Sequence, residues 1–165
     1  GQTMDEDFAA FFQKWTLEPR YGSPLVDHLP IVEGIPTPKD ILGHHIGANR
    51  TLTYYEDILR YYRALAEATP RVWVEDIGLS DEGREMVIVW VSSDENMSGL
   101  QGNRDNLAKI ADPRGRSEAE IQQLLNTTKP HYHVIAGLHS GELGAPEATM
   151  EMMYRLAVEI GRAHV

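Results

Sequence analysis

Two side chains that could share a metal ion lie three residues apart in the glycine-rich stretch 137–144. His139 supplies an imidazole and Glu142 a carboxylate, and Zn²⁺ accepts both as ligands in proteins. A catalytic zinc typically has three protein ligands and a water, so this pair would provide two of the three. The alternative interpretation is structural: Glu142 would face the positive end of the next helix dipole, and His139 would be an ordinary loop histidine.

The residues on either side of this stretch predict a strand before it and a helix after it. Val134, Ile135 and Ala136 form a short apolar run followed by glycine, which is typical of a buried strand. Pro146 and Glu147 suit the first turn of a helix, where a missing N–H costs little and an acid faces the dipole. The pair would then lie beyond the carboxyl end of a strand, where open α/β sheets bind ligands.

Other residues of this region and of the N-terminal part offer weaker sites. His131 and His133 would share one face of a strand and could chelate a metal, although such a pair is more often structural. Ser140 lacks the G-x-S-x-G surroundings of a hydrolase nucleophile. His44 and His45 are adjacent and would point apart in an extended chain, so a shared metal between them is not favoured.

The remaining pattern predicts an α/β fold with a partial mixed sheet, a hairpin plus a further strand, flanked by helices. Residues 1–47 read as an amphipathic helix followed by a proline-rich extended segment, and residues 1–165 as a single, incomplete domain. A capping box from Thr53 to Glu56 would open the next helix, and a second from Ser117 to Glu120 a later one. The expected hairpin strands are 72–79 and 86–91; the other expected helices cover 98–111 and run from about residue 146 almost to the end. Three strands leave exposed sheet edges that favour association with a partner.

Composition excludes several classes of function. The formal net charge is −10 and no basic cluster occurs, which argues against a nucleic-acid partner. The chain has no cysteine, so disulfides and thiolate metal sites are excluded. No stretch is long enough to span a membrane and no signal peptide is visible. Gly1 stands where Met would, which indicates a processed or trimmed chain from which an upstream signal peptide could have been removed, so composition alone leaves the localisation open.

The run from Ile135 to Glu147 resembles the first zinc-binding motif of zinc carboxypeptidases of the carboxypeptidase A-like type. Upstream pieces of the sequence agree with this resemblance, and two further pieces are similar to large secreted bacterial members in particular. This similarity implies a secreted or periplasmic protein whose signal peptide has been removed. The resemblance covers the chain from about Pro24. The agreeing pieces are Leu52-Thr53-Tyr54-Tyr55, Ile77-Gly78, Glu82-Gly83-Arg84 and Ser92-Ser93, and those similar to the bacterial members are residues 107–114 and Leu29-Pro30 with Pro36-Thr37-Pro38.

The resemblance implies the first half of a three-layer metallopeptidase fold that uses Zn²⁺ to hydrolyse C-terminal peptide or related amide bonds. By it, His139 and Glu142 are two zinc ligands. The third ligand, the general base and the substrate-binding residues would come from further downstream, beyond residue 165, because the sole later histidine is His164. The isolated chain is therefore expected to be inactive on its peptide substrate. The alternative is a non-catalytic relative that binds a peptide or partner chain.

Overall fold

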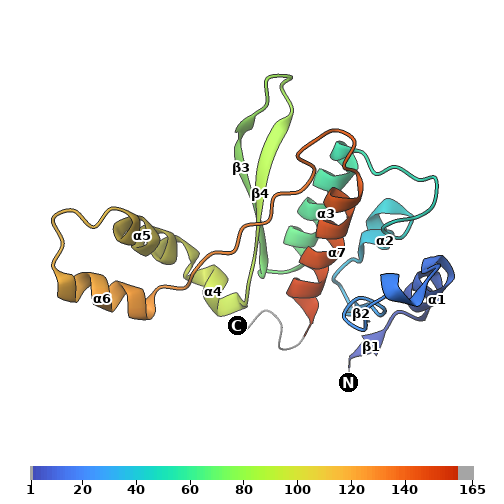
Figure 1. The fold of residues 1–165 in the computed structure, drawn as a ribbon, viewed down its shortest axis with the longest axis horizontal. Coiled ribbons are helices and arrows are strands. Elements are labelled where there is room, and N and C mark those ends of the chain that lie inside the picture. Colours follow the sequence, from blue (N-terminus) through green and yellow to red (C-terminus); the bar gives the residue numbers. More distant parts are fainter. Residues whose placement is uncertain (1, 160–165) are drawn as a thin grey trace. The chain divides into compact units, whose positions relative to one another are not determined.

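The computed structural model describes residues 2–159, in which the short strands all precede the last four helices (Figure 1). The predicted α/β class is confirmed. In chain order the elements are β1 (Thr3–Met4), α1 (Glu6–Trp15), the 3₁₀ turn η1 (Pro19–Tyr21), β2 (Pro30–Ile31), α2 (Pro38–Leu42), α3 (Tyr55–Ala68), β3 (Val72–Leu79), β4 (Glu85–Val91), α4 (Asp94–Ser98), α5 (Leu100–Ala111), α6 (Glu118–Thr127) and α7 (Gly144–Val158).

The described residues form two compact units, the first made of residues 2–93 with 136–159 and the second of Asp94–Ile135. The single domain expected over residues 1–165 stays a prediction. No helix within residues 2–159 combines the length and the apolar character that crossing a membrane requires.

The core of the first unit lies where α7 packs against α3 and the hairpin. Met150, Tyr154 and Ala157 recur at helical spacing along α7 and are completely buried or nearly so. Burying a large apolar side chain contributes about 1.5–3 kcal/mol, so this stripe fixes α7 in place. The Tyr154 hydroxyl donates to the Pro30 carbonyl at 2.8 Å, and burial raises the pKa of Tyr154 to about 12.

Strands β3 and β4 form the predicted antiparallel hairpin, with Val72 opposite Val91 and Trp73 opposite Trp90. Alternation directs Val72, Val74, Val89 and Val91 toward the helices, where they contact the core. A bulge between Asp76 and Gly78 interrupts the register, and Gly78 has a φ of +120° that other residues rarely adopt. The face that bears the two tryptophans includes a hydrogen bond from Trp90 Nε1 to Glu75 Oε2 at 2.7 Å.

The strand expected at residues 134–136 is not formed. Val134 and Ile135 are 48% and 85% exposed, and within residues 2–159 the ladders are β1 with β2 and β3 with β4. An apolar run becomes a strand only when another strand takes up its backbone hydrogen bonds, and no described residues pair with this one. The sequence pattern shows that the run is hydrophobic, but it does not show whether another strand is available to pair with it.

The N-terminal part contains more regular structure than the expected extended segment. Thr37 and Asp40 form a complete capping box at the start of α2. His45 is buried against the rings of Phe8 and Phe11, and its Nε2 lies 2.6 Å from Asp7 Oδ2. The same carboxylate accepts a hydrogen bond from Lys39 Nζ. The bond to Lys39, and to a smaller extent the bond to His45, keep the pKa of Asp7 below its usual value.

The second unit consists mainly of the helices α5 and α6. The Ser117 hydroxyl oxygen accepts the backbone N–H of Glu120, which confirms Ser117 as the N-cap of α6. The Asn103 amide joins α5 to the residues after α6, because its Oδ1 accepts from Lys129 N at 2.9 Å and its Nδ2 donates to Lys129 O at 2.8 Å.

Candidate metal site

The side chains of His139 and Glu142 contact each other directly. His139 Nδ1 lies 2.7 Å from Glu142 Oε1, the His139 backbone N–H donates to Glu142 Oε2 at 3.2 Å, and Glu142 N–H returns a bond to His139 O at 3.0 Å. The His139 ring and backbone thereby keep the pKa of Glu142 below its usual value. Both side chains are largely exposed, at 73% and 52%, so they are accessible from solution.

The two donor atoms fit a shared zinc ion. Zinc binds histidine nitrogen and carboxylate oxygen at about 2.0–2.2 Å, so two atoms that share one ion must lie within about 4.4 Å of each other. His139 Nδ1 and Glu142 Oε1 lie 2.7 Å apart, which is the distance of a direct hydrogen bond, and as two ligands of a tetrahedral zinc they would separate to about 3.3 Å, still within this limit. Neither group is buried or committed to a cation among the described residues. The pair therefore suits two positions of a zinc site.

Within residues 2–159 no cluster of three or more potential ligands is formed. His131 and His133 lie in the second unit with their ring centroids 6.3 Å apart, and Asn103 Nδ2 lies 3.0 Å from His131 Nε2. Burial lowers the pKa of His131, and electrostatic repulsion from His133 and Arg104 lowers it further. The remaining sequence candidate for a third ligand, His164, lies outside the described residues.

Gly137 and Pro146 fix the two ends of the loop that carries the pair. Gly137 has a φ of +72°, and a Cβ atom added there would lie 2.8 Å from Pro146 Cγ. Glycine is thus required at this position for two reasons: the backbone conformation is one that other residues rarely adopt, and Pro146 leaves no space for a Cβ atom. Because Pro146 is in the first turn of α7, the start of the loop rests directly on the start of the helix.

The sequence did not predict the role of Glu147, the residue after Pro146. Its carboxylate is buried and accepts hydrogen bonds from Gly47 N–H and from the Thr53 hydroxyl, each at 2.8 Å. The predicted capping box at Thr53 is wrong: α3 begins after Tyr54 without a side-chain cap, and the Thr53 hydroxyl donates to the buried carboxylate of Glu147. A motif of four neighbouring residues cannot predict a hydrogen bond to Glu147, which lies 94 residues away from Thr53 in the sequence.

A third contact holds the first turn of α7 against α3. The Tyr62 hydroxyl donates to Thr149 Oγ1 at 3.1 Å, and the Thr149 hydroxyl donates to the Pro146 carbonyl at 2.8 Å. Figure 1 shows α3 and α7 beginning at the same end of the unit, where the chain leading into each helix also lies. The loop with His139 and Glu142 thus leads into a helix that packs directly on α3.

The sequence model of the zinc carboxypeptidase family matches residues 58–164, well over half of the chain. The chain belongs to the zinc carboxypeptidase family. This confirms the resemblance drawn from the sequence, and the matched range contains both His139 and Glu142. No similarity to a curated protein or to a solved structure was found for the chain.

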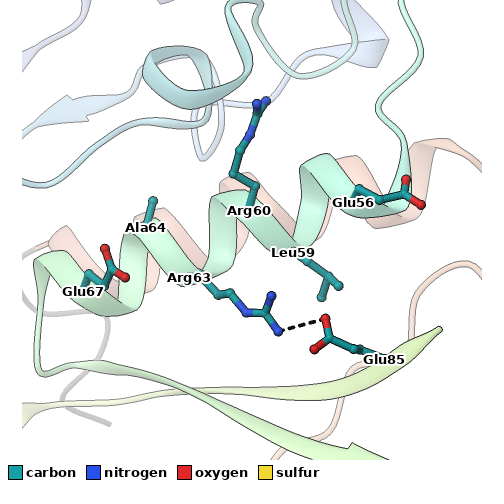
Figure 2. A pocket seen from close by; sticks show the side chains of 7 residues that line it. All are labelled: Glu56, Leu59, Arg60, Arg63, Ala64, Glu67 and Glu85. Atoms are coloured by element: carbon teal, nitrogen blue, oxygen red, sulfur yellow. Dashed lines mark hydrogen bonds and ion pairs between the residues drawn. The ribbon is translucent and has the colours of Figure 1, made fainter. Parts of the chain in front are cut away.

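The zinc carboxypeptidase chain also has an open hollow of about 470 Å³ along α3, separate from the loop 137–144. Figure 2 shows Arg63 bridging from α3 to Glu85 on β4, with a distance of 3.0 Å between Arg63 Nη2 and Glu85 Oε2. Arg60, also in the lining, pairs with Asp57 at 2.9 Å. Arg63 and Glu85 are thus paired across the hollow, Arg60 pairs with a residue outside it, and we assign the hollow no ligand. Its full lining is Glu56, Leu59, Arg60, Arg63, Ala64, Glu67 and Glu85.

Proposed function

We propose that this chain carries two of the zinc ligands, His139 and Glu142, of a metallocarboxypeptidase that hydrolyses C-terminal peptide or related amide bonds. The observation that supports this most directly is the match of residues 58–164 to the zinc carboxypeptidase family, a range in which His139 and Glu142 are in contact on an exposed loop. The substrate of this protein would accordingly be a peptide.

Each side chain of the pair would contribute in its own way. The lowered pKa of Glu142 keeps its carboxylate ionised at neutral pH, which is the state that binds a cation. His139 offers a ring nitrogen on the same side of the loop, and its exposure leaves room for substrate and water. When bound, zinc polarises the scissile carbonyl and lowers the pKa of its water ligand.

We also propose that the 165-residue chain by itself is inactive. Two protein ligands hold zinc less firmly than three, and the proposed reaction also requires a general base and a group that binds the substrate carboxylate. Removal of a single element of this kind costs about 10²–10⁴ in rate.

A non-catalytic function, in which the chain binds a peptide or partner, is favoured by a different observation. Trp73, Ile77, Leu79 and Met86 of the hairpin are between 39% and 64% exposed. Exposed apolar side chains on a two-stranded sheet offer a surface for another chain. Under this alternative, peptide binding would persist in variants of His139, whereas under the enzymatic proposal it would depend on zinc.

Zinc titration by calorimetry tests the proposal. We expect one zinc site per chain, whose affinity falls at least tenfold in both His139→Ala and Glu142→Gln. His28→Ala is a matched control, because His28 Nδ1 also lies 2.7 Å from a carboxylate, that of Asp27, at the other end of the unit's sequence. Zinc binding that is unchanged in His139→Ala, or equally reduced in His28→Ala, would refute the assignment. Sub-micromolar affinity would indicate a third ligand, from His131, His133, His164 or a neighbouring chain.

A further inference from the structure

Glu147 holds an unusual position for a carboxylate. It is 9% exposed, it lies five residues after Glu142, and both of its oxygens are used on one short segment of distant sequence. Oε2 accepts the Gly47 N–H and Oε1 accepts the Thr53 hydroxyl, each at 2.8 Å. One side chain therefore closes the base of the segment 47–53 and attaches it to the first turn of α7.

This arrangement is costly for a purely structural contact. Removing an ionised carboxylate from water costs several kcal/mol, and within residues 2–159 no cation lies within ion-pair distance of Glu147. The compensation comes from two neutral donors and from the positive end of the α7 dipole. A neutral side chain could join the same elements without the desolvation cost, so the fixed position of this turn calls for a further role.

The first turn of α7 controls both ends of the loop 138–143. At one end, the Pro146 ring lies so close to Gly137 that a Cβ atom there would collide with it. At the other end, α7 begins at Gly144, two residues after Glu142. A displacement of the first turn would thus move Gly137 and Gly144 together and change the relative placement of His139 and Glu142.

We propose that Glu147 is a positioning residue for the zinc pair: by fixing the first turn of α7 to the segment 47–53, it holds His139 and Glu142 in register for one ion. This inference rests on the proposed function. It assigns Glu147 no contact with metal or substrate. Outer residues that orient metal ligands typically change metal affinity by about 10–100-fold when they are replaced.

Three variants separate positioning from loss of stability and from loss of charge. Glu147→Gln keeps the shape of the side chain but removes the charge and places an N–H₂ against one of the two donors. Thr53→Val removes one hydrogen bond and leaves the Glu147 charge in place. Tyr154→Phe is the matched control, because it removes a buried hydroxyl bond two turns further along α7, at 2.8 Å to Pro30, away from the loop.

Two measurements are made on each variant of the whole chain. Zn²⁺ affinity by calorimetry is expected to fall at least tenfold in Glu147→Gln and several-fold in Thr53→Val, and to stay unchanged in Tyr154→Phe. Amide hydrogen exchange in the metal-free chain is expected to quicken at least threefold at Glu142, whose N–H donates to His139 O, in the first two variants and not in the control.

The outcomes are distinct. Unchanged exchange at Glu142 in Thr53→Val would overturn the proposal, as would a fall in zinc affinity confined to Glu147→Gln, which would mark an effect of charge alone. Equal changes in Tyr154→Phe would reduce the effect to general destabilisation and overturn it too. Zinc binding that never depends on His139 would refute the proposed function, while the exchange measurement would still decide whether Glu147 orders the loop. If Glu147→Gln does not fold, Thr53→Val decides alone.

Discussion

Replacement of Gly137 by alanine should destabilise the fold by an amount that can be divided into two parts. A left-handed backbone conformation costs an L-residue about 1–2 kcal/mol, and Gly137 has a φ of +72°. The added Cβ would also meet Pro146 Cγ at 2.8 Å, and relieving a contact of this kind in a packed region costs about 1–3 kcal/mol. We therefore expect Gly137→Ala to lower the free energy of unfolding by about 2–5 kcal/mol.

Urea denaturation of four proteins, the parent, both single variants and the double variant, would measure the two parts. In a Pro146→Ala background the collision is absent, so Gly137→Ala should cost only about 1–2 kcal/mol. Gly141→Ala, in the same loop with nothing within 4 Å of the added Cβ, is the control and should change stability by less than about 0.5 kcal/mol. Equal effects of Gly137→Ala and Gly141→Ala, or no coupling to Pro146, would refute this reasoning.

Three further predictions concern the rest of the first unit, and urea unfolding checks each of them. Hydrogen bonds from Lys39 and His45 lower the pKa of Asp7, so the stability that its carboxylate contributes is present above the ordinary value of 3.8 and is lost as the pH falls through the folded value. Asp7→Asn should therefore be less stable than the parent above pH 4, and its stability should fall less steeply than that of the parent below pH 4. Tyr154→Phe leaves the Pro30 carbonyl buried without its donor and should cost about 1–3 kcal/mol; a smaller loss would mean that water replaces the hydroxyl. Arg155→Met removes the buried guanidinium that pairs with Glu151 at 2.9 Å and with Glu159 at 3.0 Å and should cost about 3–5 kcal/mol, and a stability equal to that of the parent would contradict this.

The elements that the sequence predicted correctly are those set by local chemistry. The strands 72–79 and 86–91 agree with β3 and β4 to within one residue, because runs of β-branched and aromatic residues flank a turn of Asp81, Glu82 and Gly83. The first helix and the N-cap at Ser117 also follow from the residues nearest to them. Each of these features depends on interactions within a few positions of sequence.

The features that sequence reasoning missed depend on distant partners. Thr53 has a good capping sequence, yet its hydroxyl binds a carboxylate that only the fold brings near. The run 134–136 has strand composition without a neighbouring strand in the described residues. For the candidate site, the spacing of His139 and Glu142 predicted that they could meet, and they lie 2.7 Å apart. The sequence did not reveal the attachment of their loop through Glu147.

The closure of the segment 47–53 by a single carboxylate has a consequence for how this protein can vary. Residues 49–52 at the tip are exposed, while Gly47 and Thr53 at the base are fixed to Glu147. Lengthening a loop whose ends are already held costs only about 0.6 kcal/mol for each doubling of its length. The tip is thus a place where insertions, grafted peptides or a new recognition sequence can be accepted without disturbing the helix start beneath it.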